Sequence, residues 1–129
     1  MRKVLRRFYR KFMQQSSGIF MEKFSVLISV YSKETPEWFR ASLDSVFDQT
    51  VQPDEVVIVK DGPLTADLDA VVDDAVARHP QIKVVALDKN QGLGHALNEG
   101  LRHCSHCLVA RMDSDDLCKP TRFDSELKE

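Results

Sequence analysis

The chain has 129 residues, of which 43% are hydrophobic and 29% are charged, and this length and composition suit one globular domain that buries a core. It contains no run of about 18 apolar residues and no apolar stretch behind its N-terminal positive charges, which excludes a membrane span and argues against a secretory signal. The three cysteines form no regular framework, and their odd number indicates a reducing compartment.

The charges divide the chain into two parts. Residues 1–23 carry a net charge of +6 and the remainder carries −8, so we treat 1–23 as a basic amphipathic N-terminal segment and 24–129 as a separate domain. Four apolar residues of the first segment fall on one helical face, namely Val4, Leu5, Phe8 and Phe12. A basic amphipathic helix binds anionic lipid, so a peripheral membrane contact is one expectation; a basic tail and a transit peptide are the alternatives. The acidic domain argues against nucleic acid as a partner.

Four short apolar runs rich in β-branched residues predict the strands of the domain, at 24–30, 55–60, 82–87 and 107–112. Their almost continuous apolar character is typical of parallel strands that are covered on both faces. Three amphipathic stretches of helical period lie between them, the first beginning at Thr35-Pro36, the second running from Thr65 to His79, and the third covering 93–101. The order βαβαβαβ predicts a Rossmann-like α/β domain, with a mostly parallel sheet of about four strands and flanking helices.

In such a sheet the ligand crevice lies beyond the carboxyl ends of the strands. The loops after the first, second and fourth strands read YSKETP, KDGPLT and DSDDLCKP, and we expect them to converge. The last loop places Asp113, Asp115 and Asp116 within four positions. Mg²⁺ and Mn²⁺ are often held by one or two carboxylates together with substrate phosphates, and a cation would relieve the repulsion among these three. A metal site is therefore one interpretation, and a solvated Asp/Ser turn is the other.

Two longer stretches carry a family resemblance. The first, FSVLISVYSKETPEWFRASLDSVFDQTVQPDEVVIVKDGP, ends with an Asp-Gly after the second strand. The second, NQGLGHALNEGLRHCSHCLVARMDSDDLCKPTRF, joins an Asn-x-Gly-x-x-x-Ala-x-Asn-x-Gly helix to an Asp-x-Asp-Asp turn. In this order and spacing, residues 24–124 resemble the N-terminal, nucleotide-sugar-binding half of a family 2 glycosyltransferase with a GT-A fold. The resemblance implies metal-dependent, inverting transfer of a sugar from a nucleotide-diphospho-sugar to a glycan or lipid-linked acceptor, in surface polysaccharide biosynthesis.

The resemblance also implies roles for the matched residues. Val30 and Tyr31 would flank the nucleotide base, and Asp61 would read its edge. The start of the donor-side helix and its packing would depend on the motif residues Asn90, Gly92, Ala96 and Asn98. Asp113 would approach the ribose and the cation, and Asp115 would ligate Mn²⁺ or Mg²⁺, with Asp116 as the third, supporting carboxylate.

Three positions bear on how far this match extends. Lys60 stands where members often have the first of two acidic residues, which leaves the details of base recognition open. Leu97 stands where many members have an arginine, so one donor contact is expected to be missing or replaced. His95 lies near the helix start and could reach a phosphate, although a surface histidine is the simpler interpretation.

In the family the general base lies C-terminal to the metal motif, and this chain has 13 residues after Asp116. We therefore expect a domain that is truncated after the Asp-x-Asp motif, binds donor without transferring sugar by itself, and self-associates through exposed apolar surface. Its expected location is the cytoplasm, peripheral to the inner face of the membrane. A non-catalytic nucleotide-binding or regulatory α/β module is the alternative. A response-regulator-like domain is disfavoured because its acidic pair would follow the first strand, where this chain has YSKET.

Overall fold

The computed structural model of the chain describes residues 8–10 and 23–127. Its elements follow in the order β1 (Phe8–Arg10), β2 (Phe24–Val30), α1 (Pro36–Phe47), β3 (Glu55–Lys60), α2 (Ala66–Arg78), β4 (Ile82–Ala86), α3 (Leu93–His103), β5 (Leu108–Asp113) and α4 (Arg122–Leu127). The four predicted strands and three predicted helices are all present, with strand ends that differ from the prediction by at most one residue. None of the described helices is long and apolar enough to cross a membrane.

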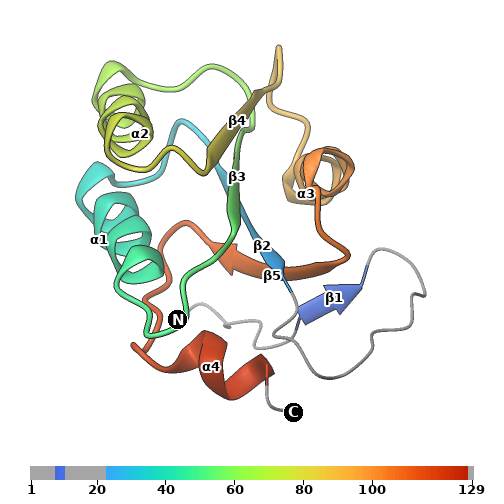
Figure 1. Ribbon diagram of the computed structural model, residues 1–129. Coiled ribbons are helices and arrows are strands. Elements are labelled where there is room, and N and C mark those ends of the chain that lie inside the picture. The colour runs from blue at the N-terminus through green and yellow to red at the C-terminus, as the bar shows by residue number, and fades with distance from the viewer. Residues whose placement is uncertain (1–7, 11–22, 128–129) are drawn as a thin grey trace.

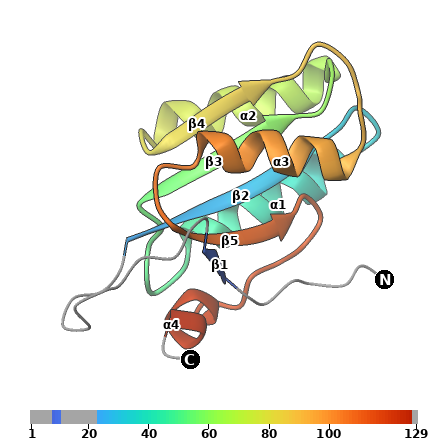
Figure 2. The ribbon, with the colours of Figure 1, turned by 90° about the vertical axis from the view of Figure 1, so that its right-hand side faces the viewer.

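The strands form one sheet in the order β1-β5-β2-β3-β4. β5, β2, β3 and β4 are parallel, and β1 pairs antiparallel with the outer edge of β5. Helices α1 and α2 cover one face of the sheet and α3 covers the other, so the domain has three layers (Figures 1 and 2). The α/β class and the mostly parallel sheet are therefore confirmed.

The core divides into two clusters because the sheet separates its helices. The larger cluster lies between the sheet and α1 and α2, and the smaller one lies under α3. The ring of Phe123 in α4 packs edge to face on Phe24 of β2, with centroids 5.2 Å apart, and both side chains are fully buried. The loop after β5 is thereby closed by a helix that is anchored in the larger cluster.

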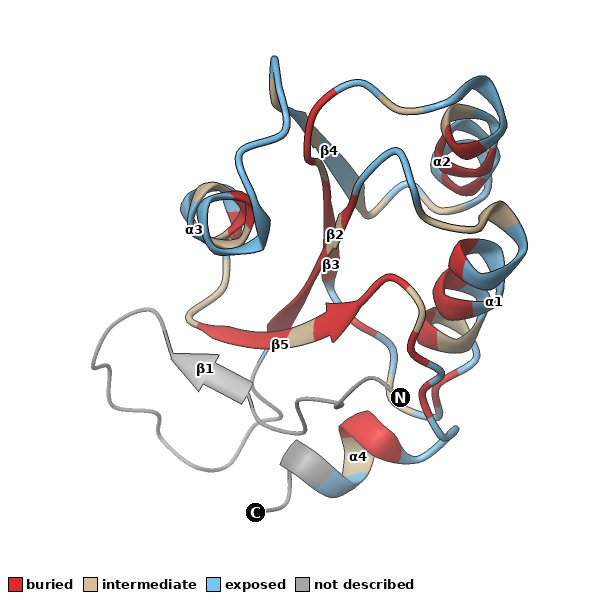
Figure 3. Ribbon diagram, turned by 180° about the vertical axis from the view of Figure 1, so that it is seen from behind, coloured by how far each residue is buried: buried red, intermediate tan, exposed pale blue. Residues whose placement is uncertain are grey.

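Coverage of the strands on both faces holds for β2, β3 and β5 but not for β4. Nearly every residue of the first three strands is buried, whereas β4 has exposed and half-buried positions, with Val84 37% exposed (Figure 3). The prediction was wrong here because β4 is an edge strand whose single partner among the described strands is β3. An apolar run in the sequence does not reveal which strand will be at the edge.

The basic N-terminal segment is described only in part. Phe8–Arg10 forms β1, with Phe8 opposite Ala110 of β5, so the helical interpretation is wrong for these three residues. An antiparallel strand satisfies backbone groups along the outer edge of β5, and aromatic residues favour extended conformation. Residues 1–7 and 11–22 lie outside the described residues. The expected contact of this segment with lipid therefore stays a prediction.

Candidate functional site

The register of the sheet brings the predicted loops together. Ser29 of β2 is paired with Asp113 of β5, and Val30 of β2 is paired with Lys60 of β3. Because these strands are parallel and end at the same level, the residues that follow them emerge at one edge of the sheet. Tyr31, Asp61 and Ser114 are the first residues past these three ends.

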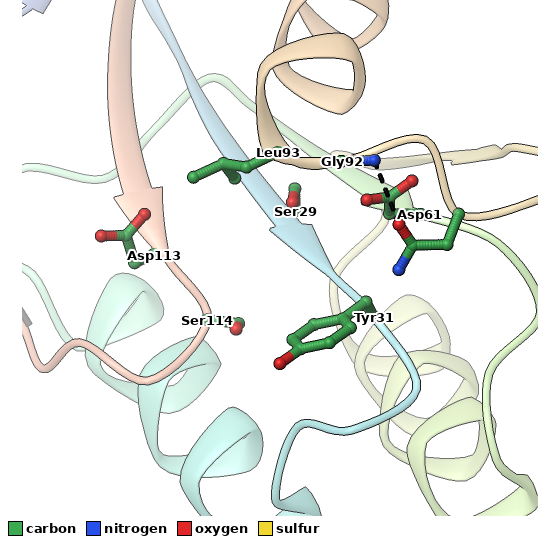
Figure 4. Close-up of a pocket in the computed structure, with 8 residues that line it drawn as sticks. Ser29, Tyr31, Asp61, Gly92, Leu93, Asp113 and Ser114 are labelled. Carbon is green, nitrogen blue, oxygen red and sulfur yellow. Dashed lines mark hydrogen bonds between the residues drawn. The ribbon is translucent and has the colours of Figure 1, made fainter.

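A cavity of about 240 Å³ opens at this edge. Its lining comes from the ends of three strands and from the start of α3, and consists of Ser29, Tyr31, Asp61, Asn90, Gly92, Leu93, Asp113 and Ser114. In Figure 4 Asp113 stands on one side of the opening, with Tyr31 and Asp61 across from it. The structure thus gathers five of the predicted site residues, namely Tyr31, Asp61, Asn90, Gly92 and Asp113, from segments up to 82 positions apart.

Backbone contacts fix the wall formed by the β3 and α3 loops. The Oδ1 atom of Asp61 accepts a hydrogen bond from the backbone N–H of Gln91 at 2.9 Å, and the side-chain oxygen of Asn90 accepts one from Gly92 N–H at 3.0 Å. Gly62 has φ of +89°, and a Cβ there would lie 2.6 Å from the backbone nitrogen of Asn90. The Asp-Gly pair after the second strand therefore has a physical cause: only a residue without a Cβ lets these two loops approach so closely.

The acidic loop after β5 begins with a tight turn. The backbone N–H of Asp116 donates to the carbonyl of Asp113 at 3.1 Å, and the Asp116 carboxylate accepts from the Asp113 N–H at 3.2 Å. Asp113 and Asp116 are both buried, and Asp115 is half-buried and does not line the cavity. One oxygen of Asp113 also accepts from the Arg111 guanidinium at 3.2 Å. The three carboxylates therefore differ in their surroundings, and that of Asp116 stabilises the turn.

Carboxylate oxygens are suitable donors for a hard cation, and two carboxylates, Asp61 and Asp113, line the cavity. Within residues 8–10 and 23–127, no three His, Cys, Asp or Glu side chains are grouped so as to hold a metal ion by themselves. Mg²⁺ and Mn²⁺ sites of the kind that relies on substrate phosphates need only one or two protein carboxylates. Asp113, which lines the cavity, fits a cation of this kind, whereas Asp115, two positions later, lies outside the lining.

Several expected residues lie outside the cavity. Val30 is 1% exposed and belongs to the larger core cluster, because alternate side chains of a strand point to opposite faces and its neighbour Tyr31 takes the cavity side. Asn98 lies in the middle of α3, five positions after its first residue, and borders a different, apolar hollow. Lys60 is turned toward α2, where it forms an ion pair with Asp69 at 2.9 Å, and His95 is exposed outside the cavity lining.

Three residues of the lining were not predicted from the sequence: Ser29, Leu93 and Ser114. The signal for Ser29 was a polar residue in an otherwise apolar strand, and Ser114 was the intervening residue of the Asp-x-Asp motif. Glu34, beside the lining, was also not predicted. Its carboxylate accepts hydrogen bonds from the Ser114 hydroxyl and from the Thr35 N–H. The loop after β2 and the acidic turn are therefore joined directly beside the cavity.

The chain is similar to proteins that make bacterial glycans. The family model described as Glycosyl transferase family 2 matches residues 25–129. The amylovoran biosynthesis glycosyltransferase of Erwinia amylovora is 49% identical over 104 residues, which are 81% of this chain and 39% of that protein. The UDP-Gal:alpha-D-GlcNAc-diphosphoundecaprenol beta-1,3-galactosyltransferase of Escherichia coli is 47% identical over 102 residues, 79% of this chain and 37% of that protein. The chain thus spans about two fifths of the length of these curated relatives.

Its fold is also that of a solved enzyme with donor and metal bound. The mannosyltransferase PcManGT from Pyrobaculum calidifontis, in complex with GDP-Man and Mn²⁺, superposes with a TM-score of 0.70 at 26% identity. The match covers 84% of this chain and 31% of that one. Sequence and fold therefore agree on the same family.

Proposed function

The chain belongs to glycosyl transferase family 2, and we propose that its cavity binds the nucleotide-diphospho-sugar donor of a metal-dependent, inverting sugar transfer. The observation that carries the proposal is the convergence of Tyr31, Asp61 and Asp113 in one cavity at the carboxyl edge of the sheet. An aromatic ring, a fixed carboxylate for a base edge and a carboxylate suited to a cation lie within one small volume. These are the groups that a base, a ribose and a diphosphate require.

We assign the nucleoside to the wall formed by the β2, β3 and α3 loops. The exposed ring of Tyr31 offers a stacking surface, and Asp61 is held by the Gln91 N–H so that its second oxygen is available to a base N–H. Asn90 and Gly92 shape the loop before α3, through the hydrogen bond from the Gly92 N–H to the Asn90 side chain. Since Lys60 is paired with Asp69 on α2, recognition of the base falls to Asp61 in this proposal.

We assign the diphosphate to the acidic turn. Asp113 would face the ribose and share the cation with Asp115, while Asp116 keeps the turn closed through the Asp113 N–H. Mn²⁺ or Mg²⁺ bound there would neutralise the charge that develops on the leaving diphosphate oxygens. Arg111 keeps one oxygen of Asp113 engaged from the other side, so that this carboxylate is oriented before the donor arrives.

In an inverting transfer the acceptor hydroxyl attacks the anomeric carbon and loses its proton to a carboxylate that acts as general base. By analogy with the relatives, this base and the acceptor site would correspond to the three fifths of their length that this chain does not span. By analogy with what the names of those relatives state, the acceptor is a growing glycan or a diphospholipid-linked sugar. Such an acceptor would place the enzyme in the cytoplasm against the inner face of the membrane.

The experiment is calorimetric titration of the purified chain with UDP and with GDP, each in the presence and absence of Mn²⁺. We expect one of the two nucleotides to bind, and to bind about tenfold more tightly with Mn²⁺, a coupling of the usual size between two ligands that bind together. Asp113→Asn and Asp115→Asn should remove the metal-dependent part of the affinity. Asp73→Asn, which changes an exposed carboxylate on α2, is the matched control. Failure of both nucleotides to bind, or an unchanged Mn²⁺ effect in both site variants, would refute the proposal.

A further inference from the structure

Two serines of helix α1 and a glutamine just past its end at Phe47 bond to the acidic loop. They are Ser42, Ser45 and Gln49, spaced three and four positions apart, which we call the α1 ladder. Ser42 is fully buried and Gln49 is 4% exposed. Burying a hydroxyl or an amide costs free energy unless it is hydrogen-bonded. These side chains should therefore have hydrogen-bond partners inside the protein.

All three side chains bond to the backbone of the loop that contains the Asp-x-Asp motif. The Ser42 hydroxyl donates to the carbonyl of Asp116 and lies 3.5 Å from that of Asp113. The Ser45 hydroxyl accepts from the Cys118 N–H at 3.0 Å. In Figure 1 this loop runs from the end of β5 past α1 to α4.

Gln49 continues the series at the end of the loop. Its amide nitrogen donates to the Lys119 carbonyl at 2.6 Å, and its amide oxygen accepts from the Phe123 N–H at 3.0 Å. The backbone of Thr50, just past the helix, donates to the Pro120 carbonyl at 2.8 Å. Helix α1 and the residues that follow it therefore supply the hydrogen-bond partners that the backbone of this segment requires.

The position of the first bond connects the ladder to the candidate site. Ser42 meets the carbonyls of Asp113 and Asp116, which are the two ends of the turn that carries Asp115. A hydroxyl that donates to the last residue of a turn and packs against the first restricts the direction in which the carboxylate between them, that of Asp115, points. The bonds go to backbone atoms, so they hold the turn whatever side chains it carries.

We propose that Ser42 is a positioning residue for the donor site, supported by Ser45 and Gln49, and that the affinity for metal and nucleotide depends on these polar side chains of α1 and of the turn that follows it. The inference rests on the proposed function and deepens it, because it names what holds the cation-binding turn in its active geometry. The competing interpretation is that the ladder only stabilises the fold.

A matched serine separates the two interpretations. Ser25 in β2 is also fully buried, and its hydroxyl donates to Glu55 at 2.8 Å, at the end of the sheet opposite the cavity. Ser25→Ala and Ser42→Ala each delete one buried hydroxyl that bonds a partner distant in sequence. Both are expected to lower the thermal unfolding midpoint, so stability alone does not discriminate between them.

The discriminating measurement is the effect of Mn²⁺ on nucleotide affinity. For UDP and for GDP separately, the dissociation constant without Mn²⁺ is divided by the one with Mn²⁺. Ser42→Ala should weaken binding in the presence of Mn²⁺ by about tenfold, the size of effect seen when groups that orient metal ligands are removed. Without Mn²⁺ its affinity should stay within about twofold of the wild type, a free-energy difference too small to assign to a lost contact. Ser25→Ala should leave both constants unchanged.

An equal Mn²⁺ effect in Ser42→Ala and the wild type would overturn the inference while leaving the proposed function intact. A wild-type chain that binds neither nucleotide would overturn both. If Ser42→Ala does not fold, Ser45→Ala removes the half-buried acceptor of the Cys118 N–H and decides the question in the same assay. For it, a metal-dependent loss of affinity supports the ladder, and wild-type affinity with a lowered midpoint overturns it.

Discussion

Glu55 is a buried carboxylate at the start of β3, and its replacement by glutamine is expected to destabilise the fold without weakening nucleotide binding. The side chain accepts hydrogen bonds from the Ser25 hydroxyl at 2.8 Å, and from the Ser105 N–H and hydroxyl at 2.8 and 2.9 Å. The ammonium group of Lys83 lies 3.1 Å from it. One carboxylate thus joins β2, β3, β4 and the connection between α3 and β5.

The size of the effect follows from the pKa of this carboxyl. Burial raises the pKa of Glu55, but the hydrogen bonds from Ser105, Ser25 and Lys83 outweigh that effect and lower it from 4.5 to about 2. Each pKa unit is worth about 1.4 kcal/mol, so the ionised group contributes about 3 kcal/mol to the free energy of unfolding at neutral pH. Because the folded pKa is the lower one, this contribution is fully present above pH 4.5 and is lost as the pH falls toward 2.

The assay is urea unfolding of the wild type and Glu55→Gln at pH 7, 5, 4 and 3. We expect the wild type to be more stable by about 3 kcal/mol at pH 7, and the gap to narrow below pH 4.5 because protonated glutamate and glutamine are then alike. Glu37→Gln, at an exposed position in the first turn of α1, should show no such gap. A difference of the same size at pH 7 and pH 3, or none at either, would contradict the reasoning.

Two glycines give further predictions. Gly100→Ala should lower the free energy of unfolding by about 1–3 kcal/mol although alanine favours helix, because the new methyl would run into the Leu27 side chain; an unchanged or higher urea midpoint would show that α3 does not pack so closely on β2. Gly62→Ala should weaken nucleotide binding and lower stability by about 1–3 kcal/mol, since φ is +89° and the backbone of Asn90 is in the way. Gly92→Ala has φ of +95° but open space around the new methyl, and a loss as large in this control would mean that strain alone, without the contact between the loops, explains the effect.

Most of the fold could be predicted because its strands are buried and β-branched. The run at 24–30 matches β2 residue for residue, and Thr65 caps α2 as expected by accepting the Leu68 N–H at 3.2 Å. What failed depends on neighbours distant in sequence. The exposure of β4 follows from its place at the edge of the sheet. β1 forms where the side of β5 that faces away from β2 offers backbone groups for pairing. Neither position can be read from the local pattern of residues.

The membership of family 2 glycosyltransferases is confirmed, whereas the roles of individual site residues stay predictions. Parallel topology was enough to predict that Tyr31, Asp61 and Asp113 would meet. It was not enough to exclude Val30, which strand alternation turns into the core, or Asn98, which lies about 7 Å along α3 from its start at 1.5 Å per residue. These two motif residues therefore lie outside the cavity lining, Val30 in the core and Asn98 at an exposed position of α3.

The α1 ladder extends this reasoning from the motif residues to their support. Ser42 lies among the apolar positions Phe39, Leu43 and Val46 on the buried side of α1, where a helix that only packed on a sheet would be apolar throughout. Gln49, two residues past the end of the helix, is also buried. A polar residue that interrupts an apolar face predicts a buried partner, and here each partner is a backbone atom of the loop that carries the acidic motif. The sequence signal that this loop is fixed in position thus lay in α1 and the residues just after it, about 70 positions before the loop. Variation at Ser42 or Gln49 should therefore change metal-dependent nucleotide binding even when every carboxylate is retained.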